Sequence, residues 1–121
     1  MTTYYIQEVS ERCKISKSKL RYYEKHDILT NIQRDANNKR IYTEKDIELI
    51  SLIQCFTLLN MPLKEIKQYM HQLSSNQTTV PDILETHLEV LKSEQALITK
   101  RIEAIEHRLK DKNWSYTCEK N

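Results

Sequence analysis

The chain has 121 residues, of which 39% are hydrophobic and 30% charged, and its formal net charge is +2. This length predicts one domain, or one domain with an extension. No apolar run approaches the roughly 18 residues of a membrane span, and the N-terminus lacks a secretion-signal layout, so we expect a cytoplasmic protein with no membrane partner. Three widely spaced cysteines, Cys13, Cys55 and Cys118, favour reduced thiols over disulfides.

The positive charge is concentrated near the N-terminus. Residues 12–40 contain nine Lys and Arg against three Asp and Glu, a net charge of +6, whereas residues 76–121 contain seven against eight. A localised basic segment is the electrostatic footprint that nucleic-acid binding requires. From charge alone, a merely solvated face is the alternative.

The first third of the chain predicts two short helices joined by a tight turn. Tyr4-Tyr5 leads as a short strand into a helix over about 7–13, and Lys14-Ile15 forms the turn. Ser16 is a good N-cap for a second helix over about 17–26, because its hydroxyl can accept a bond from a free backbone N–H. One face of this helix is cationic and hydrogen-bonding; it carries Ser18, Arg21, Tyr22 and Lys25. This is the helix-turn-helix pattern, whose second helix enters the major groove.

A β-hairpin is expected next. Segments 32–35 and 39–42 read as short strands, with the turn between them centred on Asn37-Asn38. Basic side chains flank the tip, namely Arg34, Lys39 and Arg40. They are placed to touch the DNA backbone beside the major groove, as a wing does. An inert basic hairpin is the alternative, because most such contacts go only to phosphates.

Two further helices precede a linker. Thr43 and Asp46 predict a capping box at the start of a helix that runs to about residue 59. This helix is apolar almost all round, so we expect it to be buried. Pro62 opens a fourth helix, where its missing N–H costs nothing. The polar stretch 74–79 is a linker.

The last helix carries a repeating apolar seam. The seam residues follow one another at alternating steps of four and three: Leu84, Leu88, Leu91, Gln95, Ile98, Ile102, Ile105 and Leu109. A 3.5-residue period over nearly four heptads predicts a coiled coil, and one helix cannot bury its own seam. We therefore expect a homodimer; packing within the same chain is the alternative.

The ordered set Leu20-Arg21-Tyr22-Tyr23-Glu24, then Arg34, Arg40, Tyr42 and Asp46, resembles the DNA-binding domain of MerR-family transcription regulators. The resemblance runs from Tyr5 to about Leu73. It implies a mainly α fold with three parts: a winged helix-turn-helix with a small β-hairpin wing over 1–75, a long antiparallel coiled-coil dimerisation helix over 80–112, and a tail over 113–121. It also implies a homodimer that binds double-stranded promoter DNA, distorts it in response to a signal and thereby acts on RNA polymerase.

The resemblance and the charge pattern together predict which residues contact DNA. The residues expected to make them are Lys17, Ser18, Arg21, Tyr22, Arg34, Lys39, Arg40 and Tyr42.

The chain contains no glycine. In the MerR pattern, glycines usually fall at four left-handed turn positions, where this sequence has Lys14, Asp27, Asn38 and Asn60. Asn and Asp tolerate that conformation best, so we expect the backbone path to be kept. Lys14 is the exception and is expected to carry about 1 kcal/mol of strain.

The signal is expected at Cys55. The stretch 53–67 is similar to the AdhR/NmlR branch of MerR regulators, which carry one cysteine at this point of the third helix and respond to aldehydes or other electrophiles. The resemblance implies that Cys55 senses electrophile, aldehyde or redox stress. The residue alone reads as a small inert hydrophobe. Two further alternatives are a non-covalent ligand near Tyr69, Met70 and Trp114, and a coiled-coil interaction protein that does not bind DNA.

Motifs of enzymes and cofactor sites are missing from the sequence. There is no Gly-rich phosphate loop, no Gly-x-Ser-x-Gly and no His-Glu-x-x-His. The cysteines that metal-sensing MerR relatives carry at both ends of the dimer helix are not matched, since 77–80 reads Gln-Thr-Thr-Val and only Cys118 lies near the other end. We therefore expect no enzymatic activity, no metal and no cofactor.

Overall fold

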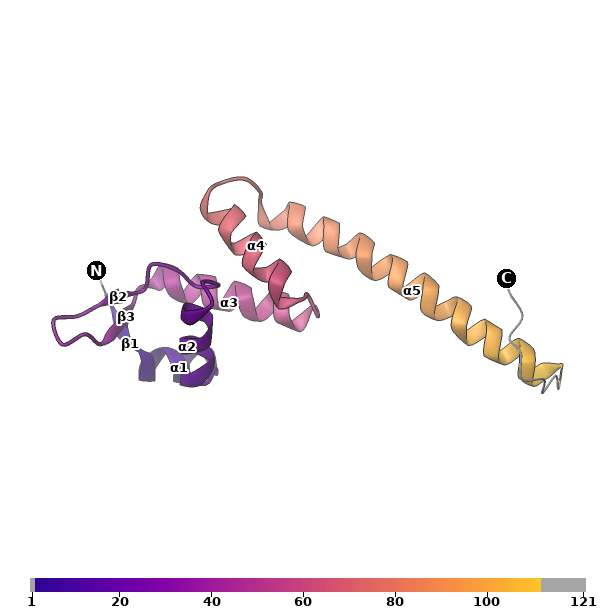
Figure 1. Cartoon of the computed structure of the whole chain (residues 1–121), viewed down its shortest axis with the longest axis horizontal. Helices are drawn as coiled ribbons and strands as arrows, with labels where there is room; N and C mark the ends of the chain where they lie inside the picture. The colour runs from indigo at the N-terminus through magenta and orange to yellow at the C-terminus, as the bar shows by residue number, and fades with distance from the viewer. Residues whose placement is uncertain (1, 112–121) are drawn as a thin grey trace. The chain divides into compact units, whose positions relative to one another are not determined.

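The computed structural model describes residues 2–111, and the chain divides into two compact units between Val80 and Pro81. In chain order the elements are β1 (Tyr4–Tyr5), α1 (Ile6–Cys13), α2 (Lys17–Lys25), β2 (Gln33–Arg34), β3 (Arg40–Tyr42), α3 (Glu44–Leu58), α4 (Leu63–Ser74) and α5 (Val80–Lys110) (Figure 1). The predicted fold class, a mainly helical winged helix-turn-helix followed by a long helix, is confirmed. The predicted tail with Trp114 and Cys118 lies outside the described residues.

The three short strands form one antiparallel sheet in the order β1-β3-β2. Tyr4 lies opposite Tyr42, and Arg34 lies opposite Arg40, so β3 is the central strand. The hairpin turn is closed by Asp35, whose Oδ1 accepts bonds from the backbone N–H groups of Asn37 and Lys39, both at 2.9 Å. The Lys39 bond first, and then a bond from the Tyr5 hydroxyl, lower the pKa of Asp35. The predicted wing is therefore a hairpin tied to the first strand.

Glu44, in the first turn of α3, anchors the sheet to the helices. Its carboxylate accepts from the Tyr4 hydroxyl and from both terminal nitrogens of Arg12, at 3.1 and 3.2 Å. The Tyr4 bond, followed by the Arg12 bonds, lowers the pKa of Glu44. One residue earlier, the predicted capping box is present: Thr43 Oγ1 accepts from the Asp46 N–H, and the Asp46 carboxylate accepts from the Thr43 N–H.

The core of the first unit is drawn from every helix in it. Its nearly solvent-free side chains include Val9, Leu20, Leu29, Tyr42, Ile50, Ile53, Phe56 and Ile66. α1 contacts both α2 and α3, so the helix-turn-helix rests on the third helix (Figure 1). Burial of these apolar side chains, each worth about 1.5–3 kcal/mol, is what holds the short elements together.

The prediction that α3 is buried all round was wrong. Ile50, Ile53 and Phe56 are fully buried, but Cys55 is exposed and Leu58 is 86% exposed. The buried residues follow one face of the helix, and no described part of the first unit covers Cys55 and Leu58 on the other. An all-round apolar sequence does not distinguish a core helix from one that keeps an apolar face at the surface.

Left-handed turns occur where they were expected. Lys14, Asp27, Asn38 and Asn60 have φ values of 54°, 57°, 61° and 59°. Two more asparagines, Asn31 and Asn76, share this conformation and were not predicted. Short polar side chains thus replace glycine at five of the six positions, and Lys14 is the one long side chain among them.

The second unit is the long helix. α5 has 31 residues, so it spans about 46 Å. All seven apolar residues of the predicted seam are exposed, from Leu91 at 36% to Ile105 at 60%, whereas Ile83 and His87 are buried. No helix among the described residues is both long and apolar enough to cross a membrane.

Candidate nucleic-acid interface

The turn between α1 and α2 is held by short local bonds. The Ile15 N–H donates to the Ser10 carbonyl at 3.1 Å, and the left-handed Lys14 closes α1. Ser16 caps α2 as predicted, because its hydroxyl accepts from the Lys19 N–H at 3.1 Å. The Gln54 amide of α3 donates to the Cys13 carbonyl at 2.8 Å, which fixes the turn against the third helix. The first helix, the turn and α2 therefore form one positioned unit.

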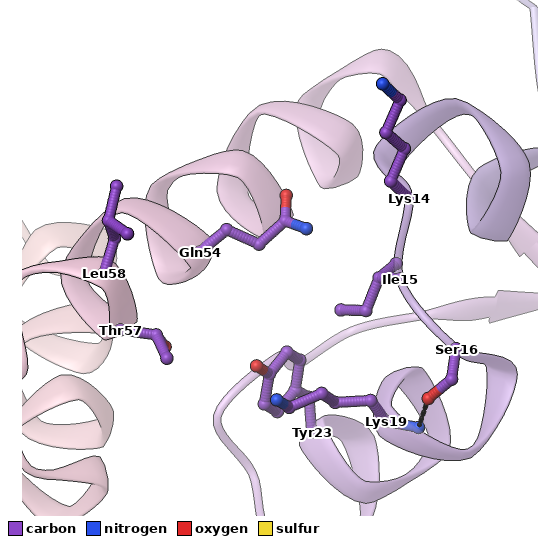
Figure 2. A pocket seen from close by; sticks show the side chains of 8 residues that line it. All are labelled: Lys14, Ile15, Ser16, Lys19, Tyr23, Gln54, Thr57 and Leu58. Atoms are coloured by element: carbon purple, nitrogen blue, oxygen red, sulfur yellow. Dashed lines mark hydrogen bonds between the residues drawn. The ribbon is translucent and has the colours of Figure 1, made fainter.

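A cavity of about 420 Å³ opens between this turn and α3. Figure 2 shows the turn residues on one side of it and the α3 residues on the other; the lining is Lys14, Ile15, Ser16, Lys19, Tyr23, Gln54, Thr57 and Leu58. Tyr23 of α2 and Thr57 of α3 both line this cavity, and burial raises the pKa of Tyr23. The neutral Tyr23 side chain is therefore packed on the inner face of α2. Lys14 and Lys19 add positive charge near the start of that helix.

The outer face of α2 presents polar and cationic groups. Ser18 and Arg21 are exposed, Lys17 is partly exposed, and Tyr22 is 42% exposed. The Tyr22 ring lies against His26 with centroids 4.2 Å apart, which holds it on the surface. Leu20 and Tyr23 point into the core, as the helical spacing predicted.

A second cavity, of about 510 Å³, gathers positive charge from elements that are distant in sequence. Its four cations are Arg21 of α2, Arg34 of β2, and Lys39 and Arg40 on the other side of the hairpin; Tyr5, Ile6, Gln7 and Asn38 complete the lining. The concave wall thus joins the start of α1, α2 and the β2–β3 hairpin. Such a cationic hollow is suited to a phosphate group, since guanidinium groups bind phosphate oxygens through paired N–H donors.

Glu24 does not line this cavity but contacts two of the arginines that do, and it was not predicted as a site residue. Its Oε1 accepts from Arg40 Nε at 2.6 Å and from Arg34 Nη2 at 3.3 Å. The sequence holds one signal for it: Glu24 is a lone acid among the basic residues of α2, three positions after Arg21. Its partners on the hairpin could be found only in three dimensions.

Tyr42 differs from the other seven residues expected to contact DNA. Its side chain is fully buried, and its hydroxyl has no hydrogen-bond partner in the part of the chain that the structure describes. Burial raises the pKa of Tyr42, so the hydroxyl is neutral. The structure therefore makes Tyr42 part of the core beneath the wing instead of an exposed contact residue, because its side chain points inward from the central strand.

Neither Cys13 nor Cys55 lines the basic cavity. Cys55 is exposed on α3, and Cys13 is partly buried, which raises the pKa of the Cys13 thiol. Within residues 2–111, no three or more His, Cys, Asp and Glu side chains are grouped so that they could hold a metal ion.

Known proteins resemble this chain in sequence and in structure. The family model described as MerR HTH family regulatory protein matches residues 4–73. A Haemophilus influenzae protein described as an uncharacterized HTH-type transcriptional regulator is 29% identical over 110 residues, which cover 88% of this chain and 82% of that protein. A Bacillus subtilis relative, the uncharacterized HTH-type transcriptional regulator YyaN, is 33% identical over 70 residues, covering 58% of this chain and 51% of its own.

Two solved structures extend the comparison to the fold. HiNmlR, described as a MerR family regulator lacking the sensor domain and bound to promoter DNA, is 29% identical with a TM-score of 0.66, covering 89% of this chain and 84% of that one. The N-terminus of the Bacillus subtilis multidrug transporter activator, MtaN, has a TM-score of 0.75 at 23% identity, covers 88% of this chain and 97% of its own, and supports the fold alone. The chain therefore belongs to the MerR family of helix-turn-helix regulatory proteins.

Proposed function

We propose that this regulator binds double-stranded promoter DNA as a homodimer, with α2 in the major groove and the β2–β3 hairpin on the adjacent backbone. The observation that carries the proposal is the cavity in which Arg21, Arg34, Lys39 and Arg40 converge. The structural similarity to HiNmlR, whose crystal structure is of a complex with promoter DNA, supports this proposal. α2 has nine residues and is about 13 Å long, a length that fits a major groove about 12 Å wide.

Base reading and backbone binding fall to different residues in this proposal. Ser18, Arg21 and Tyr22 lie on the exposed face of α2 and reach base edges and nearby phosphates. The hairpin cations reach only phosphates, which position the protein without reading sequence. Binding should therefore fall steeply with salt, because each neutralised phosphate releases counterions.

The test is duplex binding by the Arg21→Ala variant. We expect it to lose at least about 1–3 kcal/mol of binding free energy on an operator found by genomic footprinting, as for a charged base or phosphate contact. Tyr22→Phe separately tests the tyrosine hydroxyl, and Leu58→Ala, remote from the basic cavity, is the matched control. If wild type shows no salt-dependent duplex binding, the chain is instead a coiled-coil interaction protein.

The dimer is proposed to form through α5. In an antiparallel pair the contacting residues have numbers that sum to a constant, and with a sum of 193 Leu84 meets the partner's Leu109 while Gln95 meets the partner's Ile98. The remaining seam residues then pair as Leu88 with Ile105 and Leu91 with Ile102. Their exposure within one chain supports the need for a partner.

This register can be tested by disulfide cross-linking in a chain whose native cysteines are replaced by serine. A Cys replacing Gln95 should cross-link poorly to itself but well to a Cys replacing Ile98 on the partner. Efficient cross-linking between two copies at position 95 would favour a parallel pair.

The proposed action on RNA polymerase is a realignment of promoter elements by DNA distortion. One surplus base pair between two elements rotates one by about 35° relative to the other. Untwisting or kinking the DNA restores the alignment at a cost of a few kcal/mol, which the contacts of both dimer halves supply.

The proposed signal is an electrophile that adds to Cys55. The thiolate sulfur bonds to the electrophilic carbon, the C=O or C=C π bond of the reagent opens, and its electron pair takes up a proton, so no oxidant and no leaving group is needed. The exposed thiol is accessible to such a reagent. Because the thiol is exposed, an adduct there alters the surface of α3. The proposal is tested with a Cys55→Ser reporter strain beside Cys13→Ser, each challenged with formaldehyde, methylglyoxal and a quinone. DNA binding should persist in Cys55→Ser while induction is lost.

A second candidate signal is a small apolar ligand. A cavity of about 250 Å³ in the first unit is lined mainly by α3 and α4 side chains, including Leu49, Leu52, Met70 and Leu73. Met70 was among the residues expected beside such a ligand. Full induction of the Cys55→Ser strain would favour this candidate, and Leu52→Trp, which fills the cavity, should then abolish induction.

A further inference from the structure

The wing holds two like charges directly opposite each other. Arg34 on β2 and Arg40 on β3 are cross-strand partners in a hairpin whose two strands have only two and three residues. Like charges at such positions are destabilising and push the side chains apart. A hairpin this short has few other contacts with which to resist them, so these two guanidinium groups need a counter-charge to keep a defined orientation.

Glu24 supplies that counter-charge from the recognition helix. A single carboxylate oxygen accepts from Arg40 Nε at 2.6 Å and from Arg34 Nη2 at 3.3 Å. The three side chains retain only 21% to 37% of their exposure, so this pairing is less screened than a surface ion pair. It ties the hairpin to α2, the two elements that the proposed function places on DNA.

Among the described residues, this pairing leaves several N–H groups of the two arginines without an acceptor. Arg40 bonds Glu24 through Nε, so both of its terminal nitrogens keep their N–H groups for another acceptor. Arg34 uses Nη2 for Glu24 and Nη1 for the Asn38 carbonyl at 3.4 Å, which orients its plane along the hairpin. Both arginines line the cavity with Arg21 and Lys39, while Glu24 does not.

We propose that Glu24 is a positioning residue for DNA binding: it holds Arg34 and Arg40 so that their remaining N–H groups present a preformed site for one backbone phosphate. This inference rests on the proposed function. For removal of the Glu24 carboxylate, it predicts a change in DNA affinity opposite in sign to the change expected from net charge alone. Removing a carboxylate near DNA should strengthen binding by reducing repulsion, whereas removing this one should weaken binding because the two guanidinium groups lose their orientation.

The experiment compares Glu24→Gln and Glu24→Met with Asp27→Asn. Gln retains one acceptor oxygen without the charge, and Met removes the acceptor while keeping the length of the side chain. Asp27→Asn is the matched control: it removes a carboxylate three residues further on, keeps a residue that tolerates φ 57°, and breaks no ion pair among the described residues. Thermal melts verify that each variant is folded.

Affinity is measured by fluorescence anisotropy over a salt series, on a duplex selected by the wild type from a random pool and on an unrelated duplex. We expect Glu24→Gln to bind on the order of tenfold more weakly, as when one charged contact is lost, and Glu24→Met more weakly still. The slope of log affinity against log salt should fall by about 1. The loss should be similar on both duplexes, because phosphates carry no sequence. Asp27→Asn should bind as wild type or more tightly.

Two further readouts separate positioning from other roles. In an Arg34→Ala, Arg40→Ala background, Glu24→Gln should no longer weaken binding, because it acts through those arginines. In the free protein, the Arg40 Nε–H should exchange slowly with water in the wild type and rapidly in Glu24→Met. Glu24→Gln binding as tightly as wild type, or an unprotected Arg40 Nε–H in wild type, would overturn the proposal. Failure of the wild type to bind either duplex would overturn the proposed function as well and is distinguishable, since no variant would then differ.

Discussion

Two isoleucine side chains in one unit of this chain are buried, and two in the other unit are exposed. Ile50 and Ile53 of α3 are fully buried, whereas Ile102 and Ile105 of α5 are 51% and 60% exposed. The first unit packs three other helices and three strands with α3 around one core, so its apolar residues are buried within one chain. The seam of α5 is regular but uncovered in the single chain. The difference teaches that the first unit, residues 2–80 and from here on called the head, has the contacts to fold alone, while the apolar seam of α5 favours association with a second chain.

The largest expected effect breaks the association. Ile102→Asp places a charge in the proposed seam, where an unpaired buried charge is strongly unfavourable, so the dimer should dissociate to monomers at micromolar concentration. Sedimentation equilibrium measures this. Lys100→Asp changes charge on the same helix but off the seam and should stay dimeric. A dimeric Ile102→Asp would show that α5 associates through another face.

Ile53→Ala tests the other side of the comparison. Truncation of this fully buried side chain should lower the free energy of unfolding by about 2–5 kcal/mol, because it removes apolar burial and leaves a cavity. Urea denaturation of the isolated segment 2–80 should show the loss, with no dependence on protein concentration. Leu58→Ala, at an 86% exposed position on the same helix, should change stability by less than about 0.5 kcal/mol.

Lys14→Gly should stabilise the head by about 1 kcal/mol. Lys14 has φ 54°, a conformation that costs a residue with a Cβ about 1–2 kcal/mol, and the greater entropy of glycine in the unfolded chain offsets part of the gain. Chemical denaturation measures the difference. Asn60→Gly, where asparagine already tolerates φ 59°, should gain less. Equal gains at both positions would mean that Lys14 carries no special strain.

The smallest expected effect is a fall in the free energy of unfolding at acid pH, which arises from Glu44 in the head. The pKa of Glu44 is lowered in the folded state below its ordinary value of 4.5, so its bonds to Tyr4 and Arg12 stabilise the fold above that pH. This contribution is lost as pH falls from about 4.5 through the lowered value. Glu44→Gln should therefore flatten the dependence of the free energy of unfolding on pH in that window, measured by urea titration. A Glu44→Gln variant with the wild-type pH dependence in that window would contradict the prediction.

Most of the elements could be predicted from sequence because their signals are local. Ser16 caps α2, Thr43 and Asp46 form the capping box, and Asn38 and Asn60 adopt left-handed turns, all as expected. Each of these features depends on bonds within a few residues of backbone. The boundaries of α1 to α4 agree with the predicted ones to within about one residue for the same reason, and α5 ends at Lys110, two residues before the predicted end.

The candidate site was predictable in part. The basic residues of α2 and the hairpin were evident from charge and spacing, and the structure gathers Arg21, Arg34, Lys39 and Arg40 around one cavity. Glu24 was missed because its partners lie 10 and 16 residues away across a strand pair whose register the sequence does not state. From net charge alone, Glu24 only reduces the positive charge of this face. Its bonds to Arg34 and Arg40 instead make it a structural part of the face.

The sequence by itself determined the family, the order of the elements, their caps and turns, and the seam of α5, since these follow from short-range periodicity and from motifs with set spacing. Only the tertiary structure decided which side chains are covered. Tyr42 became a core residue because its side chain points inward from the central strand, and Cys55 became a surface residue because α3 buries one face and leaves the other exposed. Burial is a property of what packs over a residue, and elements distant along the chain supply that cover.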